Sequence, residues 1–403
     1  MKNKKHNPTR TKITVLHQLC NLIPAHLVPK LARETGVEDK ARSYRPWSHV
    51  VAMLFAQLTH AIGLNDVCDS LRLYSGPLSA LRGAQPPSRN GLSHANKVRS
   101  ARMAENLFWS VLDHLQTTFP QYARGKHTGP LRRFRRSIQI IDSTTIELVA
   151  QCMDWAKHRR RKAAAKTHMR LDMESLLPRF AIVDTAKHND SRRAWELCAG
   201  LKAGEIVIFD RAYNDWKHLK ELSDREVWWV GREKKGMVYD WLAEREVSGD
   251  IISDQEIMLK NNTHARRVTA WVEVDGKRRQ MTFLTNNLKW SAATICELYK
   301  ARWQIEVFFK QIKQTLKLGD FLGHSANAVR WQVWTALLVY VLLRFLSRMS
   351  QWTHSFTRLF AIVRASLWHR IDLRGYLQQL CGTADGSFRH LARPEQAYFA
   401  GFL

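Results

Sequence analysis

Four short runs of β-branched and aromatic residues, separated by segments with helical periodicity, restrict the fold of this chain most. The runs cover residues 138–141, 180–184, 206–209 and 227–230. Between the last two runs, residues 216–222 have the apolar spacing of a helix. Strands that alternate with helices indicate an α/β fold.

Segments of other character flank and interrupt this α/β region. From about residue 13 to 119, and again after residue 331, apolar residues recur at helical spacing. Between residues 233 and 286 they alternate with polar residues, as in half-buried strands. We therefore expect an α/β core with a β-rich insertion, flanked by helical N- and C-terminal regions.

Two of the apolar runs end in an aspartate, Asp142 and Asp210. In open α/β sheets, ligands bind beyond the carboxyl ends of the strands. Two carboxylates placed there can share hard divalent cations such as Mg²⁺, which prefer oxygen ligands. The structural alternative is that Asp142 begins a turn and that Asp210 caps the following helix. The sequence alone leaves both interpretations open.

A long helix, predicted over residues 291–318, carries one acid among several bases. Four of its polar residues fall within an arc of about 60° when each residue turns the helix by about 100°: Tyr299, Arg302, Glu306 and Lys313. Lys310 extends this stripe, beside an apolar face. One acid among cations suits a site that binds metal ions and phosphates. The alternative is a solvated face with an i,i+4 pair between Glu306 and Lys310.

The charge of the chain predicts a polyanionic partner. The 403 residues include 63 Lys+Arg and 36 Asp+Glu, which gives a net charge of +27. Nucleic acid is the first candidate for such a partner, and an anionic membrane surface is the second. Four arginines that precede the first strand are expected to contact the phosphate backbone: Arg132, Arg133, Arg135 and Arg136.

Neither membrane insertion nor a cysteine-based site is indicated. The most apolar run, residues 331–346, is interrupted by Arg344 and is shorter than the roughly 20 residues that a membrane span needs. We interpret this run as a buried helix. The six cysteines are widely spread and form no C-x-x-C pair, so we expect neither a zinc site nor a disulfide framework. This pattern fits a reducing cytoplasm.

The motifs together resemble those of one family. Tyr299-x2-Arg302-x3-Glu306-x6-Lys313 is similar to the Tyr-Arg-Glu-Lys signature of bacterial cut-and-paste insertion-sequence transposases. The segments that begin at Asp142 (Asp-Ser-Thr-Thr) and Asp210 (Asp-Arg-Ala-Tyr) look like the first and second acidic motifs of that family. Ala212 stands where many relatives have glycine. The resemblance covers roughly residues 137 to 320.

The resemblance implies a ribonuclease H-like catalytic core that cuts and joins DNA strands. Asp142, Asp210 and Glu306 would hold two Mg²⁺ ions, with Mn²⁺ as an alternative, and the nucleophile would be water first and a DNA 3′-hydroxyl next. Four residues of the helix would contact phosphates near the transposon end: Tyr299, Arg302, Lys310 and Lys313.

The resemblance also implies domains and partners. We expect a helical DNA-binding domain at 1–120, the first part of the catalytic core at 137–232, the insertion at 233–286, the core helix with Glu306 and the following helix at 287–345, and a helical dimer contact at 346–403. The expected partners are double-stranded DNA of the transposon ends and target, and a second copy of the chain on paired ends. No membrane and no small-molecule substrate is expected, and the expected location is the bacterial cytoplasm, at the nucleoid.

Two alternatives remain at this point. One is a catalytically inactive DNA-binding relative that acts as a repressor. The other is a metal nuclease with the same core and no joining step.

Overall fold

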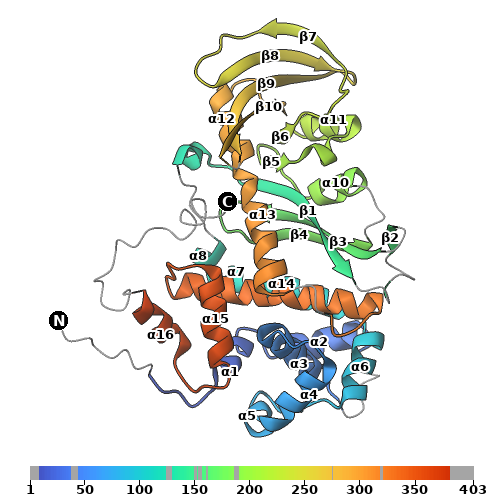
Figure 1. The fold of residues 1–403 in the computed structure, drawn as a ribbon, viewed down its shortest axis with the longest axis vertical. Helices are drawn as coiled ribbons and strands as arrows, with labels where there is room; N and C mark the ends of the chain where they lie inside the picture. The colour runs from blue at the N-terminus through green and yellow to red at the C-terminus, as the bar shows by residue number, and fades with distance from the viewer. Residues whose placement is uncertain are drawn as a thin grey trace, which may run out of the picture. The chain divides into compact units, whose positions relative to one another are not determined.

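The computed structural model describes residues 9–37, 44–123, 129–148, 152, 157–159, 162–185, 190–274, 276–317 and 321–381 (Figure 1). The chain divides into two compact units. Unit 1 comprises Met1–Ala123, Leu148–Trp155 and Lys310–Leu403, and unit 2 comprises Arg124–Glu147 and Ala156–Phe309. The last part of the predicted C-terminal region, residues 382–403, lies outside the described residues.

The elements of unit 1 in the described residues are helices. They are α1 (Val15–Cys20), α2 (Leu27–Glu34), α3 (Pro46–Thr59), α4 (Leu64–Leu73), α5 (Ser75–Ser79), α6 (Arg89–Val98), α7 (Arg102–Thr118), α8 (Pro120–Ala123), the π-helical turn η5 (Gln311–Thr315), α14 (Ala326–Met349), α15 (Phe356–Ser366) and α16 (Leu373–Leu380).

Helix α14 forms the centre of unit 1. The Ser325 hydroxyl caps its N-terminus by accepting the amide N–H of Ala328, and the helix packs on α3, α6, α7 and α15. In the described part of the chain it is the one continuous helix long and apolar enough to cross a membrane, but 89% of its most apolar window is buried in the protein. The prediction of a buried helix at residues 331–346 is therefore confirmed.

Unit 2 is built on a mixed sheet of ten described strands. They are β1 (Ile138–Leu148), β2 (Lys157–Arg159), β3 (Lys162–Asp172), β4 (Pro178–Thr185), β5 (Ile206–Phe209), β6 (Trp228–Arg232), β7 (Tyr239–Glu244), β8 (Ile251–Leu259), β9 (Thr263–Val274) and β10 (Lys277–Thr285). The strand order is β2-β3-β1-β5-β6-β10-β9-β8-β7, and β4 pairs with β3. Strands β1, β5 and β6 run parallel. Beyond β6 the sheet continues through β10, β9, β8 and β7, and each of these strands is antiparallel to the one before it.

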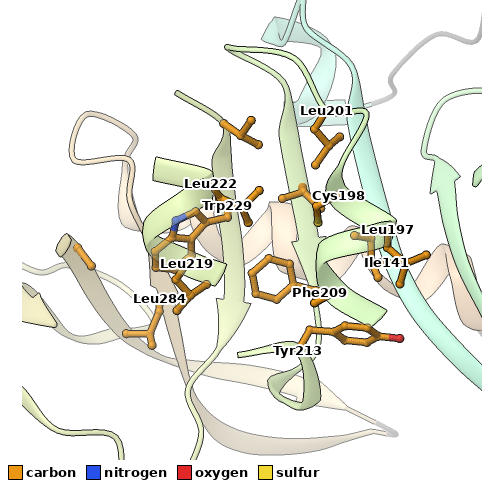
Figure 2. Packing of buried hydrophobic residues seen from close by; sticks show 14 of the residues in the cluster. Ile141, Leu197, Cys198, Leu201, Phe209, Tyr213, Leu219, Leu222, Trp229 and Leu284 are labelled. Atoms are coloured by element: carbon orange, nitrogen blue, oxygen red, sulfur yellow. The ribbon is translucent and has the colours of Figure 1, made fainter. Parts of the chain in front are cut away.

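Helices cover both faces of this sheet. They are η2 (Gly129–Arg133), α10 (Asp190–Cys198), η4 (Arg211–Tyr213), α11 (Trp216–Asp224), α12 (Ala292–Ala301) and α13 (Trp303–Lys310). Helices α10 and α11 pack on one face together with Phe209 and Trp229, as Figure 2 shows. Helix α12 packs on the other face against Ile208 and Val230. The central strands β5 and β6 are thus buried on both sides, which explains their almost unbroken apolar runs.

The structure confirms the α/β prediction and changes three details. Strand β1 does not end at Asp142 but continues to Leu148. Strand β3 was not predicted, although it lies beside β1 in the sheet. The predicted single helix over residues 291–318 is divided into α12, α13 and the π-helical turn η5.

Candidate active site

Two aspartates lie side by side at the carboxyl-terminal edge of the parallel strands. Ile141 pairs with Phe209 in the register of β1 and β5, and Asp142 and Asp210 follow these two residues. Neighbouring strands are about 4.8 Å apart. Because side chains alternate along a strand, both aspartates share the face of Ile208, which is the face that α12 covers.

The structural alternatives for these aspartates do not hold. Asp142 lies within a continuous strand rather than at the start of a turn. Asp210 occupies the N-cap position of η4, but its carboxylate makes no capping hydrogen bond. Asp142 therefore does not start a turn, and the carboxylate of Asp210 does not cap the following helix.

Helices α12 and α13 bring the remaining residues to these aspartates. The hydroxyl of Ser291 starts α12 by accepting the amide N–H of Thr294, and Leu298 anchors the helix in the core. The α-helical pattern is interrupted at Arg302, whose amide N–H donates to the carbonyl of Tyr299, three residues earlier. Helix α13 then begins at Trp303 and carries Glu306 in its first turn.

Arg302 joins two of the three acids. Its Nη1 donates to Oδ2 of Asp142 at 2.7 Å, and its Nη2 donates to Oε1 of Glu306 at 2.5 Å. The Tyr299 hydroxyl donates to Oδ1 of Asp210 at 3.1 Å. The guanidinium of Arg302 also lies 5.6 Å from the centre of the Tyr299 ring. The structure thus brings Asp142, Asp210, Glu306, Tyr299 and Arg302 together within unit 2.

The site concentrates negative charge in a partly buried space. Burial, together with the charges of Asp210 and Glu306, raises the pKa of Asp142 to about 6, against the lowering effects of Arg302 and of the Ser143 amide N–H. Burial disfavours the charge on Arg302, but Tyr299, Asp142 and Glu306 outweigh it and raise the Arg302 pKa above its ordinary value. The carboxylates therefore need a cation, and Arg302 supplies one.

The donor set matches a divalent ion by its chemistry. Three carboxylates are the hard oxygen ligands that Mg²⁺ and Mn²⁺ accept. Among the described residues, no three His, Cys, Asp or Glu side chains stand as a ready-made metal cage. Arg302 forms ion pairs with two of the three acids, Asp142 and Glu306. The residues fit a metal ion in type.

The four arginines that were predicted to contact phosphates do not lie at this site. Arg132, Arg133, Arg135 and Arg136 are exposed and precede β1, so they lie at the opposite edge of the parallel strands from the acids. About 13 Å of strand separates Ile138 from Asp142. Lys310 and Lys313 belong to unit 1, and their contacts with DNA stay predictions.

Sequence reasoning missed Arg232, the last residue of β6. Because Gly231 pairs with Phe209, Arg232 follows at the level of Asp210, on the same face as Val230. Burial raises the pKa of Tyr299, and the charge of Arg232 acts against this rise. The strand-end argument that selected the two aspartates could have found it, because it ends the next parallel strand.

Comparison with protein families identifies the class. A model of the transposase DDE domain matches residues 133–342, about half of the chain, and a domain of unknown function (DUF4372) matches residues 11–81. The chain therefore belongs to the DDE transposase family, among the transposases of bacterial insertion sequences. This family generally uses divalent metal ions.

Individual relatives agree with this class. The chain is 32% identical to a putative transposase, y4zB, of Sinorhizobium fredii over 60% of this chain and 70% of the relative. It is 28% identical to a probable transposase for insertion sequence element IS5377 of Geobacillus stearothermophilus, over 53% of this chain and 58% of that relative. A cryo-EM structure of the piggyBac transposase synaptic complex with hairpin DNA aligns over 98% of this chain and 87% of that chain, at 9% identity and a TM-score of 0.45.

Proposed function

We propose that this chain binds the terminal inverted repeats of its insertion sequence and cuts and joins DNA strands there by divalent-metal-dependent phosphoryl transfer. The proposed core is ribonuclease H-like, and Asp142, Asp210 and Glu306 are its metal ligands. The observation that carries the proposal is that these three acids, far apart in the sequence, meet Tyr299 and Arg302 on one face of the sheet.

Each residue of the site has a proposed task. The three carboxylates would hold two Mg²⁺ ions, for which Mn²⁺ could substitute. Such ions would supply activation of the attacking oxygen, first of water and then of a DNA 3′-hydroxyl, and stabilisation of the leaving oxygen. The planar fork of Arg302 suits two oxygens of a phosphate, and Tyr299 orients Asp210 through its hydroxyl. Arg232 adds a second cation at the same edge for the DNA backbone.

Further proposals concern the rest of the chain. The helical residues 1–120 recognise the terminal repeats, and residues 346–403 form the contact of a dimer on paired ends. Residues 137–232 and 287–345 supply the catalytic core, and the insertion 233–286 holds DNA beside it. Lys310, Lys313 and the arginines before β1 contact phosphates. The protein acts in the bacterial cytoplasm on nucleoid DNA.

Three single variants test the metal ligands: Asp142→Asn, Asp210→Asn and Glu306→Gln. Each keeps the side-chain shape and removes one ligand charge. We expect Mg²⁺-dependent cleavage of a duplex with one transposon end to fall by about a thousandfold or more, since the ions supply several kcal/mol of barrier reduction. Gel-shift affinity for the same duplex should change by less than about threefold, because phosphate contacts dominate binding.

Asp224→Asn is the matched control, because Asp224 is an exposed acid of α11 in an ion pair with Lys220. This variant should cleave at the wild-type rate. A pre-cut end with a free 3′-hydroxyl, supplied with target DNA, separates a transposase from a nuclease without joining activity. Full cleavage by any one of the three site variants would overturn the ligand assignment.

A further inference from the structure

Arg302 occupies oxygen atoms that a divalent ion would need. It binds Oδ2 of Asp142, and the other oxygen of that carboxylate, Oδ1, accepts the amide N–H of Ser143 at 2.7 Å. Both oxygens of Asp142 thus have donors. Mg²⁺ binds carboxylate oxygens at about 2.0–2.1 Å with near-octahedral geometry, so it competes with the guanidinium for the same lone pairs.

The contact to Glu306 makes the competition stronger. Oε1 of Glu306 accepts the second fork of the guanidinium, so Arg302 spans two acids that come from different elements, β1 and α13. A divalent ion that took both Asp142 and Glu306 as ligands would compete with the two N–H groups of Arg302 for Oδ2 of Asp142 and Oε1 of Glu306.

Arg302 is held mainly by these acids. Its Nε is buried without a hydrogen-bond partner among the described residues, and the ring of Tyr299 is its other neighbour in the site. It stands at the junction of α12 and α13, outside both helices. A long side chain at such a junction can swing to a new partner once the carboxylates no longer bind it.

We propose that Arg302 is a displaceable counter-ion, which pairs with Asp142 and Glu306 until a divalent ion binds them and which is thereby released to bind a phosphate. This inference rests on the proposed metal ligands. It adds that Arg302 weakens metal binding in the absence of DNA, although the same residue serves the reaction. Metal binding and phosphate binding by Arg302 are then linked, because each favours the same rearranged side chain.

The test measures Mn²⁺ affinity of the full-length protein without DNA, by electron paramagnetic resonance of free Mn²⁺ and by calorimetry. Arg302→Gln removes the counter-ion and keeps a polar side chain. Arg302→Lys keeps a point charge that can pair with one carboxylate at a time. We expect Arg302→Gln to bind Mn²⁺ about tenfold tighter than the wild type, because the ligand-competent state is no longer a minor one. Arg302→Lys should fall between them.

Arg211→Gln is the matched control for the charge change. Arg211 follows Asp210 directly, is exposed, and makes no ion pair with the acids in the described structure. It should alter Mn²⁺ affinity by less than about twofold, since an exposed charge is screened by water and salt. Equal tightening by Arg211→Gln and Arg302→Gln would overturn the displacement, because general charge would then explain both.

The variant Asp142→Asn distinguishes a failure of the proposed displacement from a failure of the proposed metal site. If Asp142→Asn loses Mn²⁺ binding while Arg302→Gln binds no tighter than the wild type, the metal ligands stand and the displacement is wrong. If Asp142→Asn binds Mn²⁺ as well as the wild type does, or if neither the wild type nor Arg302→Gln binds Mn²⁺, the proposed metal site itself fails and the displacement fails with it.

Discussion

The side chain of Arg302 contacts three other residues of the site, Asp142, Glu306 and Tyr299. Its guanidinium makes two ion pairs, at 2.7 Å and 2.5 Å, and its side chain is only 15% exposed. A lysine in this position would retain the charge but would lose the planar fork that reaches two oxygens at once. The substitution Arg302→Lys therefore separates the effect of the charge on activity from the effect of the side-chain shape.

We predict that Arg302→Lys folds normally but cleaves transposon ends at least about tenfold more slowly, which corresponds to roughly 1.4 kcal/mol of barrier. Positioning of the phosphate, rather than charge alone, is lost. Single-turnover cleavage measures the rate, and thermal unfolding checks the fold. The matched control is Arg193→Lys, because Arg193 of α10 also bridges two acids, Asp184 of β4 and Glu196 of α10. Wild-type rates for both variants would return Arg302 to a purely structural role.

At the scale of the elements, the contact between β5 and β6 sets the position of Asp210. Gly231 of β6 lies opposite Phe209, the residue before Asp210. A Cβ atom at Gly231 would lie 2.7 Å from Cε2 of Phe209 and 2.9 Å from Oδ1 of Asn214. Phe209 is fully buried in the core beside Trp229, so its ring has no free space to enter (Figure 2).

We predict that Gly231→Ala lowers the free energy of unfolding by about 1–3 kcal/mol, as overpacking of a core does. Cleavage should fall as well, because a shift of Phe209 moves Asp210. Chemical denaturation and the cleavage assay measure the two effects. Gly76→Ala serves as the control, since a Cβ there meets nothing within 4 Å. An unchanged midpoint for Gly231→Ala would show that the packing of β5 against β6 relaxes without cost.

The sequence predicted those elements whose signals are local. The β-branched runs indicated strands β1, β4, β5 and β6. Strand β3 was missed because it begins with Lys-Ala-Ala-Ala, residues that are uncommon in strands, and it is held by its pairing with β4. The break at Arg302 was missed because no glycine or proline marks it. It coincides with ion pairs to Asp142 and Glu306, and one of these partners is 160 residues away in the chain.

The candidate site was predictable only in part, for the same reason. The period of two along β1 and β5 places two aspartates on one face, and helical spacing places Tyr299 and Glu306 on one stripe of the helix that was predicted over residues 291–318. That the two sets meet depends on how α12 packs on the sheet, which is a tertiary interaction. The pairing of Arg302 with Asp142 follows from that packing and from no sequence pattern.

At the scale of the whole molecule, we expect the net charge of +27 to govern the encounter with the proposed DNA partner. Proteins that neutralise phosphates release counter-ions, so affinity falls steeply with salt. We predict that the logarithm of affinity for a transposon-end duplex falls linearly with the logarithm of salt concentration, with a slope of about −0.9 for each phosphate that the protein neutralises. A nearly flat plot would contradict binding through phosphates.

A set of variants then locates the cations that bind DNA. Replacing the four exposed arginines before β1 by glutamine should make the slope of affinity against salt shallower, by up to about one for each phosphate that is no longer bound. The affinity for unrelated DNA sequences should fall by the same factor. Those residues are Arg132, Arg133, Arg135 and Arg136.

The control replaces four exposed cations that already have acidic partners: Lys30, Arg72, Lys220 and Arg278. Their charge is offset locally, so the slope should stay the same. Filter-binding titrations from low to high salt measure both. If the two quadruple variants change the slope equally, net charge rather than the arginine run directs DNA binding.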